Sequence, residues 1–159
     1  MDTLLSLLKQ NARFSDKQLA AMTGTTEAEV AEKIKSFEKQ GIIKGYSVIL
    51  DDEKADKDIV TAFIELKVTP QADCGFDEIA RTVMAYDEVE SVSLMSGAYD
   101  LAVTVSGTNL KEIALFVAQR LSTIDGVLST ATHFVLKRYK EKGIFIGEDE
   151  TDQRGFVSP

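Results

Sequence analysis

The chain has 159 residues, of which 44% are apolar and 28% are charged, with two prolines, one cysteine (Cys74) and a formal net charge of −8. This composition is that of one ordinary globular domain or two small ones, and it excludes disordered, fibrous and internally disulfide-bonded proteins. No apolar stretch could span a bilayer and residues 1–12 do not resemble a signal peptide, so we expect a cytoplasmic protein without a membrane partner.

Three helices are predicted within the first forty residues. Ser15 with Gln18, and Thr26 with Glu29, fit capping boxes, in which a hydroxyl and an acidic or amide side chain pair reciprocally at a helix start. Gly24 fits the left-handed residue that ends a helix. The predicted apolar faces are Leu4, Leu5, Leu8 and Ala12 behind the cap Asp2, then Leu19, Ala20 and Met22, then Val30, Ile34 and Phe37 before Gly41.

Residues 42–50 are predicted to form a short hairpin, or wing, because Val48 and Leu50 alternate with polar residues after Gly45 and Tyr46. A capped helix pair on a third helix, followed by a wing, indicates a winged helix-turn-helix, whose second motif helix lies in the DNA major groove. Helix pairs joined by a glycine turn are also common in proteins that bind no nucleic acid, so the flanking elements carry this interpretation.

The charge is unevenly distributed along the chain. Residues 1–50 hold seven Lys/Arg against six Asp/Glu, a balance of +1, whereas the remainder holds eleven against twenty, a balance of −9. Phosphate neutralisation supplies most non-specific DNA affinity. One such near-neutral head should therefore bind DNA weakly, and several heads would have to act together.

The residues after 50 predict a linker and then a small sheet domain. Residues 51–58 are polar, and residues 59–68 form a strand that is apolar on both sides and ends at Pro70. A helical stripe over 76–84, strands over 89–94 and 99–105, a helix over 109–121 and a last strand over 127–136 follow. Gly97-Ala98 is predicted as a two-residue type II′ turn between the middle strands.

This β-α-β-β-α-β order is that of a ferredoxin-like domain. Two helices cover one face of such a sheet, so the other apolar side of the strand 59–68, with Ile59 and Phe63, needs a further partner. A second copy of the chain is the simplest candidate. The fold class is therefore α+β, with a winged helix-turn-helix at 1–50, a linker at 51–58, a ferredoxin-like domain at 59–142 and a tail at 143–159.

The order and spacing resemble the Lrp/AsnC, or feast/famine, family of bacterial and archaeal regulators over roughly residues 1–142. The resemblance rests on Leu4, Leu5 and Leu8, on Asn11 to Arg13 (NAR), on Leu19-Ala20 and Gly24, and on KIKSFEKQGIIKGY from Lys33 to Tyr46. It implies a homo-oligomer that dimerises through its sheet and assembles into tetramers or octamers, binds double-stranded DNA and senses a small molecule, usually an amino acid.

Candidate DNA contacts lie on the outward side and start of the third helix and on flanking lysines. At 100° per residue, Val30, Ile34 and Phe37 face inward, which leaves the opposite side for DNA. Lys33 stands where the family usually has arginine, and a lysine lacks the bidentate fork for phosphate. Glu29 has a competing interpretation as a cap that complements the helix dipole. The candidates are Lys17, Thr25, Thr26, Ala28, Glu29, Glu32, Lys33, Ser36, Lys39 and Lys44.

Candidate effector contacts lie at the hairpin Gly97-Ala98-Tyr99-Asp100 and at Thr130 and Thr132 of the last strand. The resemblance implies that this G-x-Y-D turn lies beside an amino-acid pocket between dimers. Backbone amides of a glycine turn can bind a carboxylate, and Asp100 can hold an ammonium group. The competing interpretations are core packing for Tyr99 and simple turn geometry for Gly97.

Enzymatic function is not expected, nor is any cofactor or metal. A lone His133 and a lone Cys74 provide no metal cluster and no catalytic dyad, and no phosphate-cradling glycine loop is present. Sirohaem decarboxylases share the two-domain plan, but they use histidine and arginine near a tetrapyrrole, which a single histidine disfavours. A DNA-binding-deficient subunit that senses an amino acid and modulates other regulators is the second alternative.

Overall fold

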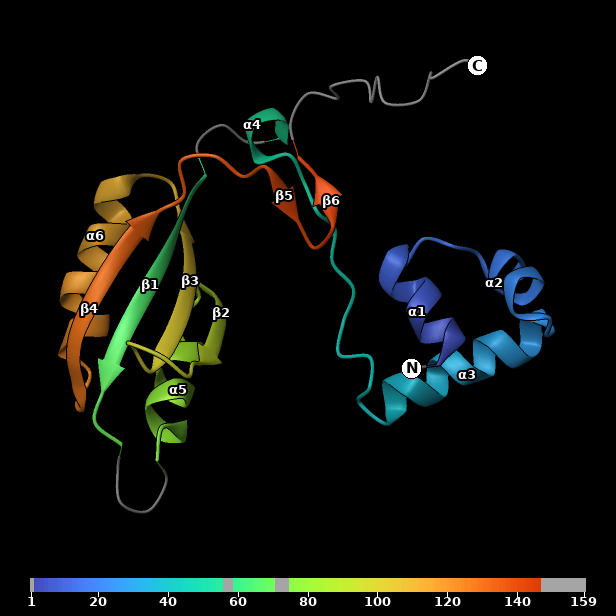
Figure 1. The fold of residues 1–159 in the computed structure, drawn as a ribbon, viewed down its shortest axis with the longest axis horizontal. Helices are drawn as coiled ribbons and strands as arrows, with labels where there is room; N and C mark the ends of the chain where they lie inside the picture. The colour runs from blue at the N-terminus through green and yellow to red at the C-terminus, as the bar shows by residue number, and fades with distance from the viewer. Residues whose placement is uncertain (1, 56–58, 71–74, 147–159) are drawn as a thin grey trace, which may run out of the picture. The chain divides into compact units, whose positions relative to one another are not determined.

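The computed structural model describes residues 2–55, 59–70 and 75–146. The chain divides into two compact units, Met1–Val48 and Ile49–Pro159, and each is treated by itself (Figure 1). Cys74 and the end of the tail lie outside the described residues. No helix in the described residues is long and apolar enough to cross a membrane.

The first unit contains the three predicted helices, α1 (Thr3–Gln10), α2 (Asp16–Thr23) and α3 (Glu27–Lys39). Both predicted capping boxes are confirmed: each N-cap hydroxyl accepts from the N3 backbone amide, and each N3 side chain accepts from the N-cap backbone amide. The Asp2 side chain accepts from the Leu4 amide and caps α1. Gly24 ends α2 with φ of 68°, the left-handed conformation that its lack of a Cβ allows.

The core of this unit is small. Its buried residues are Leu4, Leu19, Ala20 and Val30, and the partly buried residues packed on them are Leu7, Leu8, Phe14, Ile34 and Phe37. Two predicted core positions are wrong. Ala12 is exposed because α1 already ends at Gln10. Met22 is 51% exposed, because it lies about 110° around the helix from the centre of the Leu19–Ala20 face.

The predicted wing is also wrong for the described residues, since 41–50 contain no strand. The amides of Ile42 and Ile43 both donate to the carbonyl of Phe37, which closes the end of α3. A strand exists only through a hydrogen-bonded neighbour, and no described segment pairs with this one. Val48 and Leu50 are consequently 75% and 53% exposed.

The second unit has the predicted β-α-β-β-α-β order. Its sheet consists of β1 (Val60–Val68), β2 (Val89–Leu94), β3 (Leu101–Gly107) and β4 (Val127–Phe134), in the antiparallel order β2-β3-β1-β4. The crossovers are α5 (Asp77–Met84) and α6 (Leu110–Gln119), and the 3-10 turn η1 (Leu121–Thr123) precedes β4. Residues Asp52–Ala55 of the predicted linker form a short helix, α4, because the Asp51 carbonyl accepts from the amides of Lys54 and Ala55.

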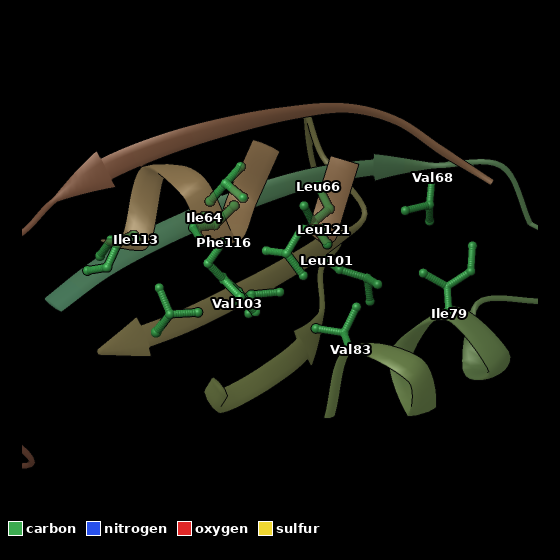
Figure 2. Close-up of a cluster of buried hydrophobic side chains, with 13 residues drawn as sticks. Ile64, Leu66, Val68, Ile79, Val83, Leu101, Val103, Ile113, Phe116 and Leu121 are labelled. Atoms are coloured by element: carbon green, nitrogen blue, oxygen red, sulfur yellow. The ribbon is translucent and has the colours of Figure 1, made fainter. Parts of the chain in front are cut away.

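Both crossover helices pack on one face of the sheet. The β1 positions Ala62, Ile64, Leu66 and Val68 alternate onto this face. The first three pair with Val105, Val103 and Leu101 of β3. Ile79, Val83, Ile113, Phe116 and Leu121 complete the core from the helical side (Figure 2). The predicted stripe residues Met84 and Leu110 are 57% and 55% exposed, because they stand at the ends of their helices.

The opposite face of the sheet carries no helix in the described residues. Register places Phe63 of β1 beside His133 of β4 and beside Thr104 of β3 on this face. The expected apolar character is only partly present: Phe63 is half-buried, and Ile59 precedes the strand and is 45% exposed. Residues Lys140–Glu141 (β5) and Ile144–Phe145 (β6) pair with each other in a separate hairpin.

Candidate functional site

Every candidate DNA contact in the first unit is exposed, on α3, at its start or on a flanking lysine. The side of α3 opposite the buried Val30 carries Ala28, Glu32 and Lys39. Among the described residues, no ion pair or side-chain hydrogen bond involves Lys17, Glu32 or Lys39, so these side chains can approach a ligand without first breaking a bond.

The carboxylate of Glu29 is occupied by the helix cap. Its Oε2 accepts from the backbone amide of Thr26 at 2.8 Å and from the Thr26 hydroxyl at 2.9 Å. These two hydrogen bonds, the backbone one first, lower the pKa of Glu29 below its ordinary value. Base readout by Glu29 would break the capping box, so the structure favours the capping interpretation for both Thr26 and Glu29.

Two further candidates have intramolecular partners. The hydroxyls of Thr25 and Thr23 lie 2.8 Å apart, and the Ser36 hydroxyl accepts from the Gln40 amide at 2.8 Å. These two contacts are exposed, so DNA can exchange them, but each lowers the gain on binding. The Lys44 ammonium lies close to Gly41 but forms no ion pair within the described residues.

Lys33 is held by an ion pair that its sequence position did not reveal. Its Nζ lies 2.7 Å from Oδ2 of Asp2, and 6.0 Å from the centroid of the Phe37 ring. The hydrogen bond from Lys33 is the largest cause that lowers the pKa of Asp2. Lys33, a candidate phosphate contact on α3, is therefore already paired with a carboxylate of its own chain.

The hairpin between β2 and β3 differs from the predicted turn. The strands end at the pair Leu94–Leu101, which leaves residues 95–100 as the connection. Gly97 does not have the positive φ that a type II′ turn requires, and the prediction of that turn is wrong. The strands stay linked as far as the hydrogen bond from the Met95 amide to the Asp100 carbonyl, so residues 96–99 close the loop, and the Asp100 amide donates to the carbonyl of Leu66 on β1.

Asp100 binds the backbone of β1 a second time. Its Oδ2 accepts from the Val68 amide at 2.9 Å, at the point where the register between β1 and β4 shifts between Lys67 and Val68. The pairing of β1 with β3 ends at Leu66 and Leu101, so the Asp100 side chain supplies the acceptor for a β1 amide beyond the end of that ladder. The sequence suggested only an ammonium-binding role, and the structure shows that Asp100 also supports the strand.

Three rings, those of Tyr99, Phe63 and His133, form a cluster beside this loop on the helix-free face. The Tyr99 ring meets the Phe63 ring edge to face, with centroids 6.1 Å apart, and the His133 ring lies 6.2 Å from Phe63. His133 Nε2 is 3.4 Å from Oε1 of Glu65. The packing interpretation of Tyr99 is thus supported. His133 lies between an aromatic ring, that of Phe63, and a carboxylate, that of Glu65.

Thr130 and Thr132 lie on the other face. They pair with Leu66 and Ile64, whose side chains point toward the helices. The Thr130 hydroxyl lies 3.5 Å from the Ser122 hydroxyl of η1. One chain therefore does not bring these threonines together with Tyr99. An effector pocket that used both the threonines and the 97–100 loop would need residues from more than one copy of the chain. A pocket within one chain could use only the threonines or only the loop.

A cavity of about 390 Å³ that sequence reasoning did not identify lies beside α5 and η1. Its lining includes Arg120, whose guanidinium pairs with Glu88 at 2.9 Å and lies 5.5 Å from the Tyr86 ring centroid. Thr82 and Thr123 in the lining donate to carbonyls of their own helical turns. These three polar side chains are thus used within the fold. No cluster of three or more metal-ligating side chains occurs among the described residues.

Comparisons with known proteins match both units. The family model described as "Lrp/AsnC ligand binding domain" matches residues 61–145, and that described as "Winged helix-turn-helix DNA-binding" matches residues 3–44. An uncharacterised HTH-type transcriptional regulator of Bacillus subtilis, YugG, is 43% identical over 157 residues, which cover 98% of this chain and 95% of that protein.

Solved structures show the same fold. A transcriptional regulator of Neisseria meningitidis, NMB0573, in complex with L-Met superimposes with a TM-score of 0.71 at 24% identity, covering 89% of this chain and 93% of that one. AsnC of Escherichia coli superimposes with a TM-score of 0.68 at 22% identity, covering 91% and 97%.

Proposed function

Because the chain belongs to the Lrp/AsnC family of helix-turn-helix transcriptional regulators, we propose that it binds specific double-stranded DNA through α3 and that an amino acid or a related small molecule modulates this binding. The observation that carries the proposal is the pair of family matches over 3–44 and 61–145, on units whose folds agree with them. We propose neither a catalytic role nor a cofactor. We propose a cytoplasmic location, because the protein would act on DNA.

The division of labour that we propose follows the chain. Residues 1–50 are the DNA-binding head, 51–58 the linker, 59–142 the sensing and oligomerisation domain, and 143–159 the tail. Lys17, Glu32 and Lys39 are the DNA contacts with the strongest support, since they are exposed and unpaired among the described residues. Thr25, Ala28, Ser36 and Lys44 contribute around them, Thr26 and Glu29 shape the helix start, and Lys33 contributes after losing its partner.

Oligomerisation supplies the affinity that one head lacks. A balance of +1 over residues 1–50 gives little phosphate neutralisation, so two or more linked heads must act on one DNA. The helix-free sheet face, with Phe63 at its centre, is the surface that a second copy would cover, and dimers would then assemble into tetramers or octamers. An effector acts by binding two such arrangements with different affinity, because only differential affinity can shift an equilibrium.

The effector site that we propose lies at the loop with Gly97, Ala98, Tyr99 and Asp100, with Thr130 and Thr132 supplied across a contact between copies. The loop exposes Gly97 and Ala98, and Asp100 lies partly exposed at its end. The Neisseria relative in complex with L-Met supports an amino acid as the ligand class. A carboxylate and exposed backbone amides fit the two charged ends of such a ligand.

The lysines give the first test of the proposed DNA surface. Replacing both Lys17 and Lys39 with glutamine should lower DNA affinity for all sequences. It should also reduce the slope of log K against log salt by about two, because each phosphate contact contributes about 0.9. Fluorescence anisotropy with a labelled duplex over a salt series measures both effects. Lys111→Gln, an exposed lysine of α6, is the matched control and should leave the slope unchanged. An unaltered slope in the double variant would move the DNA surface away from α2 and α3.

Asp100 needs a substitution that separates its two roles. Asp100→Asn keeps a side-chain oxygen for the Val68 amide but removes the charge, so it should abolish any amino-acid-induced change in DNA affinity while altering the free energy of unfolding by less than about 1 kcal/mol. Asp100→Ala should in addition lose about 1–2 kcal/mol, because the Val68 amide is left without its acceptor. Titration with the twenty amino acids and thermal unfolding check the two variants. A full effector response in Asp100→Asn would place the ammonium-binding group elsewhere.

The DNA-binding-deficient modulator remains the second candidate function, and one observation favours it. Lys33, the α3 lysine at the family's arginine position, is paired with Asp2 in a head of nearly neutral charge. A modulator would form oligomers and bind the amino acid, but it would not retain DNA even at low salt.

A further inference from the structure

We propose that Asp2 is an intramolecular competitor of DNA: its carboxylate occupies Lys33 and thereby holds down the affinity of the head for phosphate. The inference deepens the proposed function and rests on it, because it concerns how strongly the same head binds DNA. It starts from an ion pair between two helices that are distant in sequence, the N-cap of α1 and the middle of α3.

The geometry of Asp2 is that of an anion bound by two donors. Its Oδ1 accepts from the Leu4 backbone amide at 2.9 Å, and its Oδ2 lies 2.7 Å from the Lys33 ammonium. Phosphate oxygens at a protein surface take the same kinds of donor, an ammonium group and a backbone amide at a helix start. The carboxylate therefore stands where a phosphate bound by Lys33 would need to be.

Lys33 cannot serve both anions at no cost. An ammonium group donates three hydrogen bonds, and two oxygen atoms each about 2.8 Å from Nζ would be about 4.6 Å apart. Like charges at that separation repel even in water. A DNA phosphate must therefore displace Asp2 from Lys33 or bind beside it against this repulsion. An arginine could spread five donors over two anions, whereas lysine acts as a single point charge.

The pair is exposed enough to exchange. The Lys33 side chain is 50% exposed and that of Asp2 is 31% exposed. Surface ion pairs are weak and are screened by salt. The competition is therefore a graded reduction of affinity and not a lock. Residues 1–50 have a net charge balance of only +1, however, so pairing one lysine with Asp2 removes a large part of the positive charge available to DNA phosphates.

The test is a double-mutant cycle on the full chain. Asp2→Asn keeps a side-chain oxygen to cap α1, because asparagine caps as well as aspartate, and removes the charge that holds Lys33. The cycle compares the wild type, Asp2→Asn, Lys33→Gln and the double variant that carries both substitutions. Binding is measured on a duplex carrying the region upstream of the protein's own gene, and on an unrelated duplex, between 50 and 200 mM salt.

Asp2→Asn should raise the affinity for both duplexes roughly three- to tenfold at the lowest salt and steepen the salt slope by about one, because one further phosphate contact forms. Lys33→Gln alone should weaken binding less than twofold, since the lysine is already occupied. In the Lys33→Gln background, Asp2→Asn should bring no gain. A general charge effect of Asp2 would act in either background, so the cycle separates it from competition for Lys33.

Three results would overturn the inference. Weaker binding by Asp2→Asn would show that Asp2 positions Lys33 for DNA, and an equal gain with and without Lys33 would show a general charge effect. If neither the wild type nor Asp2→Asn bound DNA at any salt, the proposed function and the inference would both fail. Asp2→Ser, a second neutral cap, should reproduce the gain, which excludes an effect peculiar to asparagine. Circular dichroism confirms that α1 remains folded in each variant.

Discussion

Replacing Leu19 with alanine should abolish DNA binding while the sensing unit stays folded. Leu19 is fully buried and belongs to a cluster with Leu4, Ala20 and Val30 as its other buried members. Truncating a buried leucine costs about 2–5 kcal/mol. A unit of this size has about 2–7 kcal/mol in total at the usual stability per residue, so the substitution removes most or all of it.

The control for this prediction lies on the same helix. Met22→Ala removes a side chain of similar size, but Met22 is 51% exposed and outside the cluster, so its stability and DNA affinity should stay close to those of the wild type. Amide hydrogen exchange distinguishes the two units, since loss of protection should be confined to residues 1–48 in the Leu19 variant. DNA binding by Leu19→Ala at wild-type affinity, with hydrogen-exchange protection of residues 1–48 lost, would show that α2 and α3 do not form the DNA surface.

Phe63→Arg should dissociate the oligomer that we propose. Phe63 lies at the centre of the helix-free face, with Tyr99 and His133 packed at its edges. A central aromatic residue that a partner buries typically contributes about 2 kcal/mol or more to association, which corresponds to a rise of at least about thirtyfold in the dissociation constant. A buried, unpaired arginine adds a desolvation cost to this loss.

Sedimentation velocity over a concentration series measures this effect. Leu115→Arg introduces the same charge at an exposed apolar position of α6, on the helical side, and should leave the sheet-to-sheet contact intact. The Phe63 variant should also bind DNA more weakly, because its heads no longer act on one duplex together. A Phe63→Arg protein that keeps the wild-type assembly and remains folded would show that the copies meet through another surface.

Local features of this chain could be predicted from the sequence because local chemistry decides them. The capping boxes at Ser15 and Thr26 and the left-handed Gly24 involve residues at most three positions apart, so spacing alone predicted them. The order of strands and helices along the chain followed similarly from the alternation along β1 and from helical stripes such as Ile79 and Val83. In a small unit, the apolar sides of these strands and helices can be buried together in only a few arrangements.

Features that depend on distant partners could not be predicted. The segment 42–50 has the composition of a strand, but its pairing depends on a neighbour that periodicity does not reveal. The prediction of the β2–β3 turn was wrong: the Asp100 carbonyl accepts a hydrogen bond from the Met95 amide, and Asp100 also binds Leu66 and Val68 on another strand. Lys33 looked available until the fold placed Asp2 beside it, although the two are far apart in sequence.

The candidate effector residues illustrate the same limit. The sequence grouped Thr130 and Thr132 with Tyr99 and Asp100 by resemblance, and the register between β1 and β4 then placed the threonines on the helical side. Which face a residue occupies reverses with a shift of one position along the strand. The grouping therefore depends on how copies of the chain meet, and it stays a prediction.

The most direct test of the central claim is binding of the full chain to the DNA upstream of its own gene over a salt series, with and without a pool of amino acids. The account predicts salt-sensitive binding that prefers this sequence to an unrelated duplex, with an affinity that at least one amino acid changes several-fold. A folded oligomer that binds no DNA at any salt, or whose binding is independent of sequence and of every amino acid, would contradict it.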